Sequence, residues 1–159
     1  MICFDTAILI WGVQGAARAT QTDRIERTRR FIRYLERKKE QVMVPTPALA
    51  EYLQHFDDEA RSEQLARLQR RFVLPAFDLL AAHLAAQMAR KMMRKPRDGG
   101  VPRQALKVDV QIVATAVVHG AKTIYTGDRS AFERIAADTP VRIAEVPSIE
   151  EQRELPLDS

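Results

Sequence analysis

The chain of 159 residues has few of the features that mark secreted, disulfide-bonded or membrane-spanning proteins. Its one cysteine, Cys3, lies in a short apolar run, so there is no disulfide framework, and a reducing cytoplasm is the expected location. No segment approaches the ~18 consecutive apolar residues that a membrane helix needs. Asp5 interrupts the N-terminal apolar stretch and no basic region precedes it, which argues against a secretory signal. We therefore expect a soluble protein without membrane contact, in which Cys3 packs in the core.

The length suits one domain with a sizeable core. A content of 46% hydrophobic and 29% charged residues is typical of globular proteins, and the sequence has no internal repeat. We expect the domain to span residues 1–146. Residues 147–159, which are polar and contain two prolines, are expected to form an acidic, flexible tail.

The net charge of +4 is unevenly distributed. Residues 145–159 carry a net charge of −4, so the rest of the chain carries +8. Residues 18–40 contain nine Arg or Lys against four acids, and residues 87–107 contain seven against one. Such segments favour a polyanionic partner, although a solvated helix face explains residues 18–40 equally well.

The order of apolar runs and turn residues predicts strands and helices in alternation. Strands are expected at 2–4, 41–45, 72–76, 122–126 and 141–146, with a loop at 95–105. Helices are expected at 6–11, 22–39, 46–56, 57–70, 78–93, 109–119 and 130–136. This alternation predicts an α/β fold with a mainly parallel central sheet and helices on both faces, in three layers.

Four acidic residues are expected together at one edge of that sheet. Asp5 follows the first strand, Glu51 lies one turn into a helix that starts at Thr46–Pro47, Asp109 opens an apolar helix, and Asp128 follows a late strand. Binding sites of parallel sheets lie outside the carboxyl ends of the strands. Clustered carboxylates repel one another unless a hard divalent cation such as Mg²⁺ or Mn²⁺ lies between them. Each acid alone could be only a helix cap. Together they predict a metal-dependent phosphoryl-transfer site.

The motifs around these acids resemble those of PIN-domain ribonucleases. The resemblance rests on Ile2–Thr6, Thr46–Glu51, Lys107–Ala116 and Tyr125–Arg129 followed by Phe132, and it extends to about Val146. In size and architecture the chain looks most like the VapC-type toxins of toxin–antitoxin pairs. Many family members have an acid directly before the last phenylalanine, where this chain has Ala131, so Asp128 has to supply the fourth carboxylate.

The resemblance implies an Mg²⁺- or Mn²⁺-dependent ribonuclease that hydrolyses RNA with a metal-activated water. It makes Asp5, Glu51 and Asp109 the inner metal ligands, with Asp128 binding directly or through water. The hydroxyls of Thr6 and Thr126 would orient a ligand or water, or serve only as caps. The cations expected to bind RNA phosphates are Arg94, Lys95, Arg97, Arg103, Lys107 and Arg129.

The resemblance also implies partners. A cognate antitoxin protein is expected to cover the acidic edge, and a homodimer is expected because family members often dimerise. The three histidines, His55, His83 and His119, are not expected at this edge.

Two alternative functions remain open at this point. The first is a non-catalytic module that has the same fold and binds RNA or a protein partner. The second is a haloacid-dehalogenase-like phosphatase, suggested by Phe4-Asp5-Thr6 and by Gly127-Asp128. That family needs a second Asp two positions after the first, where this chain has Ala7.

Overall fold

The central sheet has four parallel strands in the order β2-β1-β3-β4. The computed structural model describes residues 1–93 and 103–155, and for residues 103–106 it describes the backbone alone. The strands are β1 (Ile2–Phe4), β2 (Val42–Met43), β3 (Thr123–Tyr125) and β4 (Arg142–Ala144). In the register of the sheet, Cys3 of β1 lies beside Met43 of β2 and Ile124 of β3.

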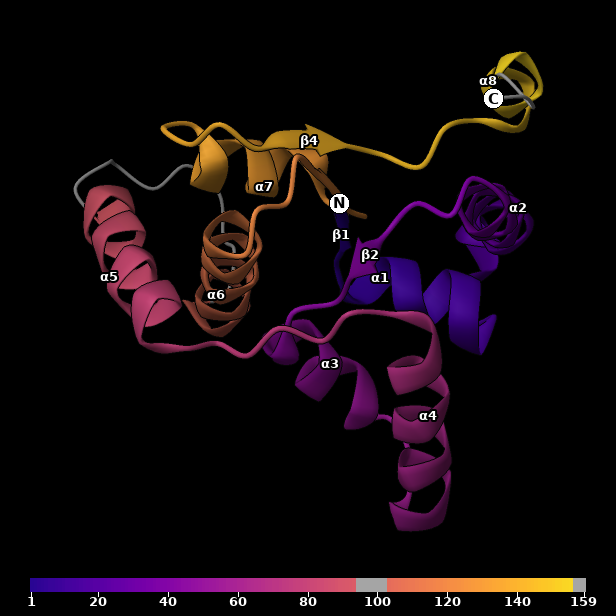
Figure 1. The fold of residues 1–159 in the computed structure, drawn as a ribbon, viewed down its shortest axis with the longest axis horizontal. Coiled ribbons are helices and arrows are strands. Elements are labelled where there is room, and N and C mark those ends of the chain that lie inside the picture. The colour runs from indigo at the N-terminus through magenta and orange to yellow at the C-terminus, as the bar shows by residue number, and fades with distance from the viewer. Residues whose placement is uncertain (94–102, 156–159) are drawn as a thin grey trace.

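Helices cover both faces of this sheet (Figure 1). The helices α1 (Thr6–Leu9) and α2 (Asp23–Arg37) lie on one side. On the other side lie α5 (Leu79–Met93) and α6 (Arg103–Val118). The prediction of a three-layer α/β/α fold with a parallel sheet is therefore confirmed. The remaining helices are α3 (Thr46–Leu53), α4 (Asp58–Arg71), α7 (Arg129–Ala136) and α8 (Ile149–Glu154), with a π-helix η1 (Ile10–Gln14) and a 3₁₀ helix η2 (Ala19–Gln21).

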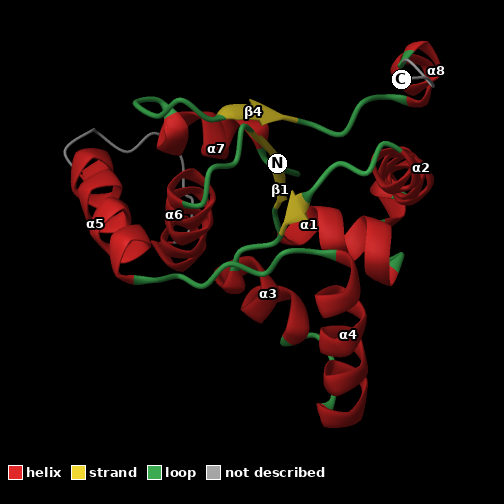
Figure 2. Cartoon of the chain, in the orientation of Figure 1, coloured by secondary structure: helices red, strands yellow, loops and turns green. Residues whose placement is uncertain are grey.

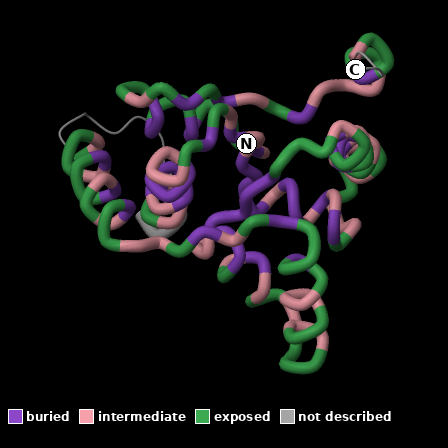
Figure 3. Tube along the Cα trace, viewed as in Figure 1, coloured by how far each residue is buried: buried purple, intermediate pink, exposed green. Residues whose placement is uncertain are grey.

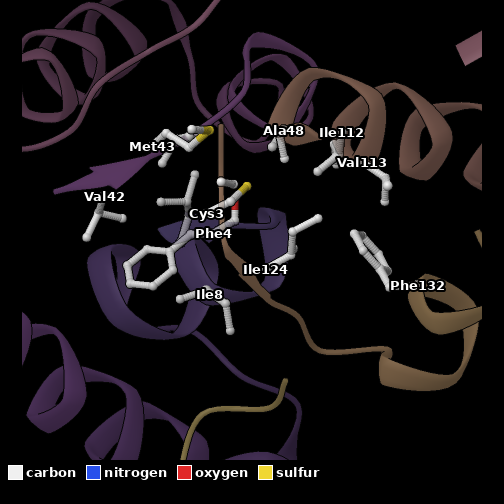
Figure 4. Packing of buried hydrophobic residues seen from close by; sticks show 14 of the residues in the cluster. Cys3, Phe4, Ile8, Val42, Met43, Ala48, Ile112, Val113, Ile124 and Phe132 are labelled. Atoms are coloured by element: carbon white, nitrogen blue, oxygen red, sulfur yellow. The ribbon is translucent and has the colours of Figure 1, made fainter. Parts of the chain in front are cut away.

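The core lies on both faces of β1, because successive side chains of a strand point to opposite faces. Figure 3 shows the buried positions concentrated along the sheet and on the helix sides that face it, while α4 and the outer side of α5 are exposed. In Figure 4, Ile112 and Val113 of α6 point toward Cys3 and Ile124. Phe4 lies near Ile8 of α1. Burial raises the pKa of the Cys3 thiol, as expected for a residue that packs rather than reacts.

Helix α2 contains most of the basic segment predicted at residues 18–40. Its buried residues are Thr28, Phe31, Ile32 and Leu35, which recur at the spacing of one helix face. Arg29, Arg33 and Arg37 are exposed. The face of Phe31 and Leu35 is therefore core.

The strand predicted at 72–76 is reduced to a single bridge between Met43 and Val73, and the rest of the segment is a loop (Figure 2). Val73 donates to Val42 O at 2.9 Å, and its own carbonyl accepts from Val44 N at 2.8 Å. Two residues later comes Pro75, which has no N–H to continue the ladder.

Asp109 does not open its helix, contrary to the prediction. Helix α6 begins at Arg103, so Asp109 lies in its second turn. The predicted loop at 95–105 is therefore wrong for residues 103–105, and residues 95–102 lie outside the described part. Ala105, Leu106 and Lys107 are good helix formers, which accounts for the earlier start.

The C-terminal segment contains a short helix where the sequence predicts a tail. Ser148 caps α8 in a reciprocal arrangement with Glu151. The side chain of Gln152 donates to Arg27 O of α2 at 3.0 Å and to Pro147 O at 2.8 Å. The flexibility of the segment and the domain boundary at residue 146 stay predictions. No helix in the described ranges is long and apolar enough to cross a membrane.

Candidate active site

All four predicted acids line one pocket with a volume of about 750 Å³. Asp5 follows β1 and Asp128 follows β3, at the carboxyl ends of neighbouring strands. Glu51 comes from α3 and Asp109 from α6. The structure therefore brings together the acidic residues that the sequence places at one edge of the sheet.

Asp5 lies at the floor of this pocket and is only 5% exposed. Its Oδ1 accepts from Ile8 N at 3.1 Å, which caps α1. Its Oδ2 accepts from Thr126 Oγ1 at 2.6 Å and from Gly127 N at 3.0 Å. Burial raises the pKa of Asp5, and these hydrogen bonds oppose that rise because they favour the charged form. The carboxylate is thus fixed from two strand ends, with lone-pair capacity remaining for another ligand.

The threonines contact the acids directly. The Thr6 hydroxyl donates to Glu51 Oε2, across the gap between α1 and α3. The Thr126 hydroxyl donates to Asp5 and accepts from Asp128 N at 3.0 Å. Both threonines are buried, so both hydroxyls orient carboxylates of the pocket.

Asp109 carries the clearest electrostatic signature of the cluster. Burial, followed by the negative charges of Asp5, Glu51 and Asp128, raises the pKa of Asp109 to about 7. Within the described ranges, none of these four carboxylates forms an ion pair with Arg, Lys or His. Their repulsion is therefore not relieved by a side chain of that part of the chain.

A divalent metal fits this site by donor type and charge. The donors are carboxylate oxygens, which Mg²⁺ and Mn²⁺ prefer, and the single cysteine, Cys3, is buried and does not line the pocket. In the described residues, however, no group of three or more Asp, Glu, His or Cys is already arranged to hold a metal ion. Asp128 is exposed, and its Oδ1 caps α7 by accepting from Ala131 N at 3.1 Å.

The cations expected to bind RNA lie elsewhere or outside the described part. Arg94, Lys95 and Arg97 are outside it, and the side chain of Arg103 is not described. Arg129 Nε pairs with Glu133 Oε1 at 2.7 Å and lines another pocket, beside β4. Lys107 is exposed, and neither Lys107 nor Arg129 lines the acidic pocket. Their proposed roles in RNA binding stay predictions.

The pocket also contains polar residues that the sequence analysis missed. The prediction for His55 was wrong, because His55 lines the pocket with Gln54. They follow Glu51 by three and four positions and come directly after α3, so this spacing was a usable signal. Arg18 and Gln21 line the pocket from another segment. They follow a turn at Gly15, whose positive φ of 76° favours glycine. His83 and His119 do not line this pocket, as predicted.

A tryptophan forms part of the wall of the pocket. Trp11 belongs to the π-helix η1, and the guanidinium of Arg24 lies 4.7 Å from the centroid of its ring. Gly127 passes so close that a Cβ on it would lie 2.7 Å from Ala7 Cβ and 2.9 Å from the Trp11 ring. The absence of a side chain at Gly127 allows the loop after β3 to approach Asp5.

Comparison with known proteins shows the family. Residues 2–138 match the PIN domain family. A search of curated proteins gave no match. Among solved structures, the chain is similar to VapBC2 from Rickettsia felis bound to a DNA fragment from their promoter. The identity is 17% over 91% of this chain and 98% of that chain, with a TM-score of 0.60. It is also similar to DNA-bound VapBC from Salmonella typhimurium, with 18% identity over 92% of this chain and 100% of that chain and a TM-score of 0.65.

At these identities the solved structures establish similarity of fold alone. The family match covers the segments of all four acids, from Asp5 to Asp128. It leaves the haloacid-dehalogenase-like alternative without support. The chain therefore belongs to the PIN domain family, a family of nucleases.

Proposed function

We propose that this protein is a metal-dependent ribonuclease and the toxin of a toxin–antitoxin pair. The observation that carries the nuclease proposal is that Asp5, Glu51, Asp109 and Asp128 line one pocket. Burial and the charges of the other three carboxylates raise the pKa of Asp109 to about 7. Carboxylates that are close enough to influence one another, and that have no cationic partner in the described residues, favour a divalent cation between them.

The residues of the pocket have the following proposed roles. Asp5, Glu51 and Asp109 would hold Mg²⁺ or Mn²⁺, and Asp128 would contribute directly or through a water. The bound ion supplies neutralisation of negative charge and activation of a water. The Thr126 and Thr6 hydroxyls fix Asp5 and Glu51, so these carboxylates lose little freedom when they bind. In the reaction the oxygen of water would bond to phosphorus while the bond from phosphorus to the ribose oxygen breaks. The ribose oxygen would leave with the proton that the water loses.

The experiment that tests this proposal is cleavage of RNA by the purified protein. We expect cleavage with Mg²⁺ or Mn²⁺, loss of cleavage with EDTA, and no cleavage by Asp109→Asn. The Asp109→Asn protein, prepared in the same way, also controls for contaminating nuclease. Full activity of that variant would exclude the proposed site.

The toxin proposal is supported by the fold shared with the two VapBC structures, whose descriptions name complexes of that type. We propose a small antitoxin partner that inserts an Arg or Lys into the acidic pocket, because a charged hydrogen bond would satisfy the carboxylates and displace metal. A homodimer and a cytoplasmic location belong to the same proposal. Expression in a bacterial host should arrest growth, and Asp5→Asn should relieve the arrest. Harmless expression of a proven ribonuclease would favour a housekeeping role in RNA processing.

A non-catalytic module that binds RNA or a protein is the second candidate. Binding of RNA without cleavage, at any concentration of Mg²⁺ or Mn²⁺, would support this alternative.

A further inference from the structure

The segment that follows β4 ends in α8, which lies against α2 (Figure 1). Gln152 of α8 is only 6% exposed, and its Nε2 donates to Arg27 O of α2 at 3.0 Å and to Pro147 O at 2.8 Å. Its Oε1 accepts no hydrogen bond within the described ranges, so the amide contributes these two donated bonds. Since α8 has six residues, too few for a stable isolated helix, its position depends on such contacts.

Arg27 binds the same segment with its side chain. Its Nε donates to Pro147 O at 2.9 Å, and a second nitrogen of the guanidinium donates to Val146 O. A planar guanidinium holds its donors at a fixed spacing, so it fixes two successive carbonyl groups at once. We call residues 146–152, held to α2 by the contacts of Arg27 and Gln152, the C-terminal clasp.

The same stretch of α2 packs against a wall of the acidic pocket. Trp11 of η1 lines that pocket, and Arg24, one turn before Arg27, lies 4.7 Å from the centroid of its ring. Thr28 follows Arg27 in the chain and packs on Gly12, where a Cβ would lie 2.8 Å from the Thr28 Cγ2. Close packing of this kind transmits a displacement, so η1 and α2 are expected to move together.

The clasp and the pocket wall meet around a cavity of about 10 Å³, with room for at most about one water. The cavity is lined by Trp11, Arg24, Arg27, Thr28, Thr126, Glu145 and Val146. Thr126 also donates to Asp5 Oδ2 at 2.6 Å. Contacts therefore extend from the clasp, through the residues of this cavity, to the group that orients Asp5.

We propose that Arg27 is a positioning residue for the acidic pocket and that the C-terminal clasp supports the pocket wall. With the clasp closed, Trp11 is held against the loop after β3, where Gly127 N donates to Asp5 at 3.0 Å. When the clasp opens, Val146 and the guanidinium of Arg27 no longer close the cavity beside Trp11. Water then reaches the ring, and the loop at Gly127 is free to move.

Arg27 touches no reacting atom in this scheme and acts through Trp11 and Thr126. The consequence for cleavage rests on the proposed ribonuclease function, whereas the consequence for Trp11 does not. A measurement on Trp11 therefore tests the clasp whether or not the protein cleaves RNA.

The experiment uses three variants of the full chain. Arg27→Ala removes the two bonds of the guanidinium, and Arg27→Lys keeps the charge without the planar fork. Gln152→Leu removes the two bonds of the amide at similar volume, and it is the sharper test because Gln152 does not line the cavity beside Trp11. The control is Arg33→Ala, at an exposed arginine of α2 that lines neither that cavity nor the acidic pocket. Circular dichroism sets a temperature at which all variants are fully folded.

Three quantities are measured at that temperature. Amide hydrogen exchange of residues 149–154 reports opening of the clasp and should accelerate in Arg27→Ala and Gln152→Leu. Trp11 is the single tryptophan of the chain, so its emission reports the pocket wall. In both variants the emission should shift to longer wavelength and be quenched more strongly by acrylamide. The kcat for RNA cleavage should fall about tenfold with little change in KM, because the clasp orients Asp5 and does not contact RNA. Arg27→Lys should give intermediate values, and Arg33→Ala should match wild type.

The outcomes separate the clasp from the function. Faster exchange of residues 149–154 with wild-type emission of Trp11 would overturn the positioning role, because the clasp would then open without effect on the wall. Unchanged exchange in Arg27→Ala and Gln152→Leu would overturn the clasp itself. A lower kcat without a change in Trp11 would overturn the route through this wall. Shifted emission in both variants, in a protein that cleaves no RNA, would support the clasp and contradict the ribonuclease proposal.

Discussion

Thr126 and Asp5 are 121 residues apart in the chain, and the Thr126 hydroxyl donates to Asp5 Oδ2 at 2.6 Å. The parallel pairing of β1 with β3 creates this contact, since each residue follows the end of its strand. The same hydroxyl accepts from Asp128 N at 3.0 Å. One buried side chain therefore couples two of the four acids of the pocket.

Replacing Thr126 should show what the two hydrogen bonds of its hydroxyl contribute, apart from the packing of its methyl group. Thr126→Val keeps the shape and leaves Asp5 Oδ2 and Asp128 N each without one partner. We expect a loss of stability of about 1–3 kcal/mol, the usual cost of an unsatisfied buried group. Cleavage should fall about tenfold or more, because Asp5 loses its orientation. Thr126→Ser, which keeps the hydroxyl, should retain most of the wild-type stability and cleavage. Wild-type cleavage by Thr126→Val would show that this bond has no role in the reaction.

Asp109 should make the metal-free protein less stable as the pH rises. Its pKa is raised to about 7, above that of an unfolded Asp, so the folded protein holds the proton more tightly. The resulting stabilisation is fully present below about pH 4 and is lost as the pH rises through about 7. Because Asp109 is only partly buried, solvent screening reduces the effect to the order of 1 kcal/mol. Asp5, whose pKa is also raised, contributes with the same sign.

Denaturant unfolding in EDTA between pH 4 and pH 8 measures this dependence. Asp109→Asn should flatten it and should be more stable than wild type at pH 8. Glu63→Gln, a change at an exposed residue of α4, is the control and should follow the wild-type curve. If Asp109→Asn keeps the wild-type pH dependence, the carboxylates do not interact as described.

Much of the fold follows from local patterns in the sequence. The apolar runs at 2–4 and 123–125 and the Thr46–Pro47 helix start are strong signals, and the parallel topology places Asp5 and Asp128 together once those strands are recognised. The start of α6 was predicted too late, because Asp109 before an apolar run resembles a helix start, whereas the helix formers Ala105, Leu106 and Lys107 already belong to the helix.

The position of Arg18 beside the acidic pocket depends on tertiary packing. Arg18 reaches the pocket through a π-helix and a left-handed turn at Gly15, neither of which has a reliable signal in a single sequence. The basic composition of residues 18–40 favours a polyanionic partner, and that partner stays a prediction. It could not show which arginine lies beside the acids.

Gly127→Ala should disturb the site by steric overlap. The added Cβ would lie 2.7 Å from Ala7 Cβ, closer than such atoms approach. We expect destabilisation of about 1–3 kcal/mol from overpacking. Cleavage should fall because the Gly127 N–H, which donates to Asp5, moves with the loop. Adding Ala7→Gly should restore part of the stability. Ser130→Ala, a change at an exposed position of α7, should have no effect on either quantity. If the stability changes of Gly127→Ala and Ala7→Gly simply add in the double variant, the two side chains do not overlap.

Glu51 reaches the pocket from a helix, as Asp109 does, and it should bind metal. Thr6 holds Glu51 Oε2, and Glu51 contributes to the raised pKa of Asp109, so its charge faces the cluster and not bulk water. Calorimetric titration with Mn²⁺ should therefore show weaker binding for Glu51→Ala, by about tenfold or more, the range seen when a group that orients or completes a metal site is removed.

Glu63→Ala removes an equal charge from an exposed position of α4 and should leave the affinity unchanged. Thr6→Val, which frees Glu51 without removing it, should give an intermediate affinity. Equal affinities for Glu51→Ala and Glu63→Ala would show that Glu51 is no ligand, and the site would then have to consist of Asp5, Asp109 and Asp128 alone.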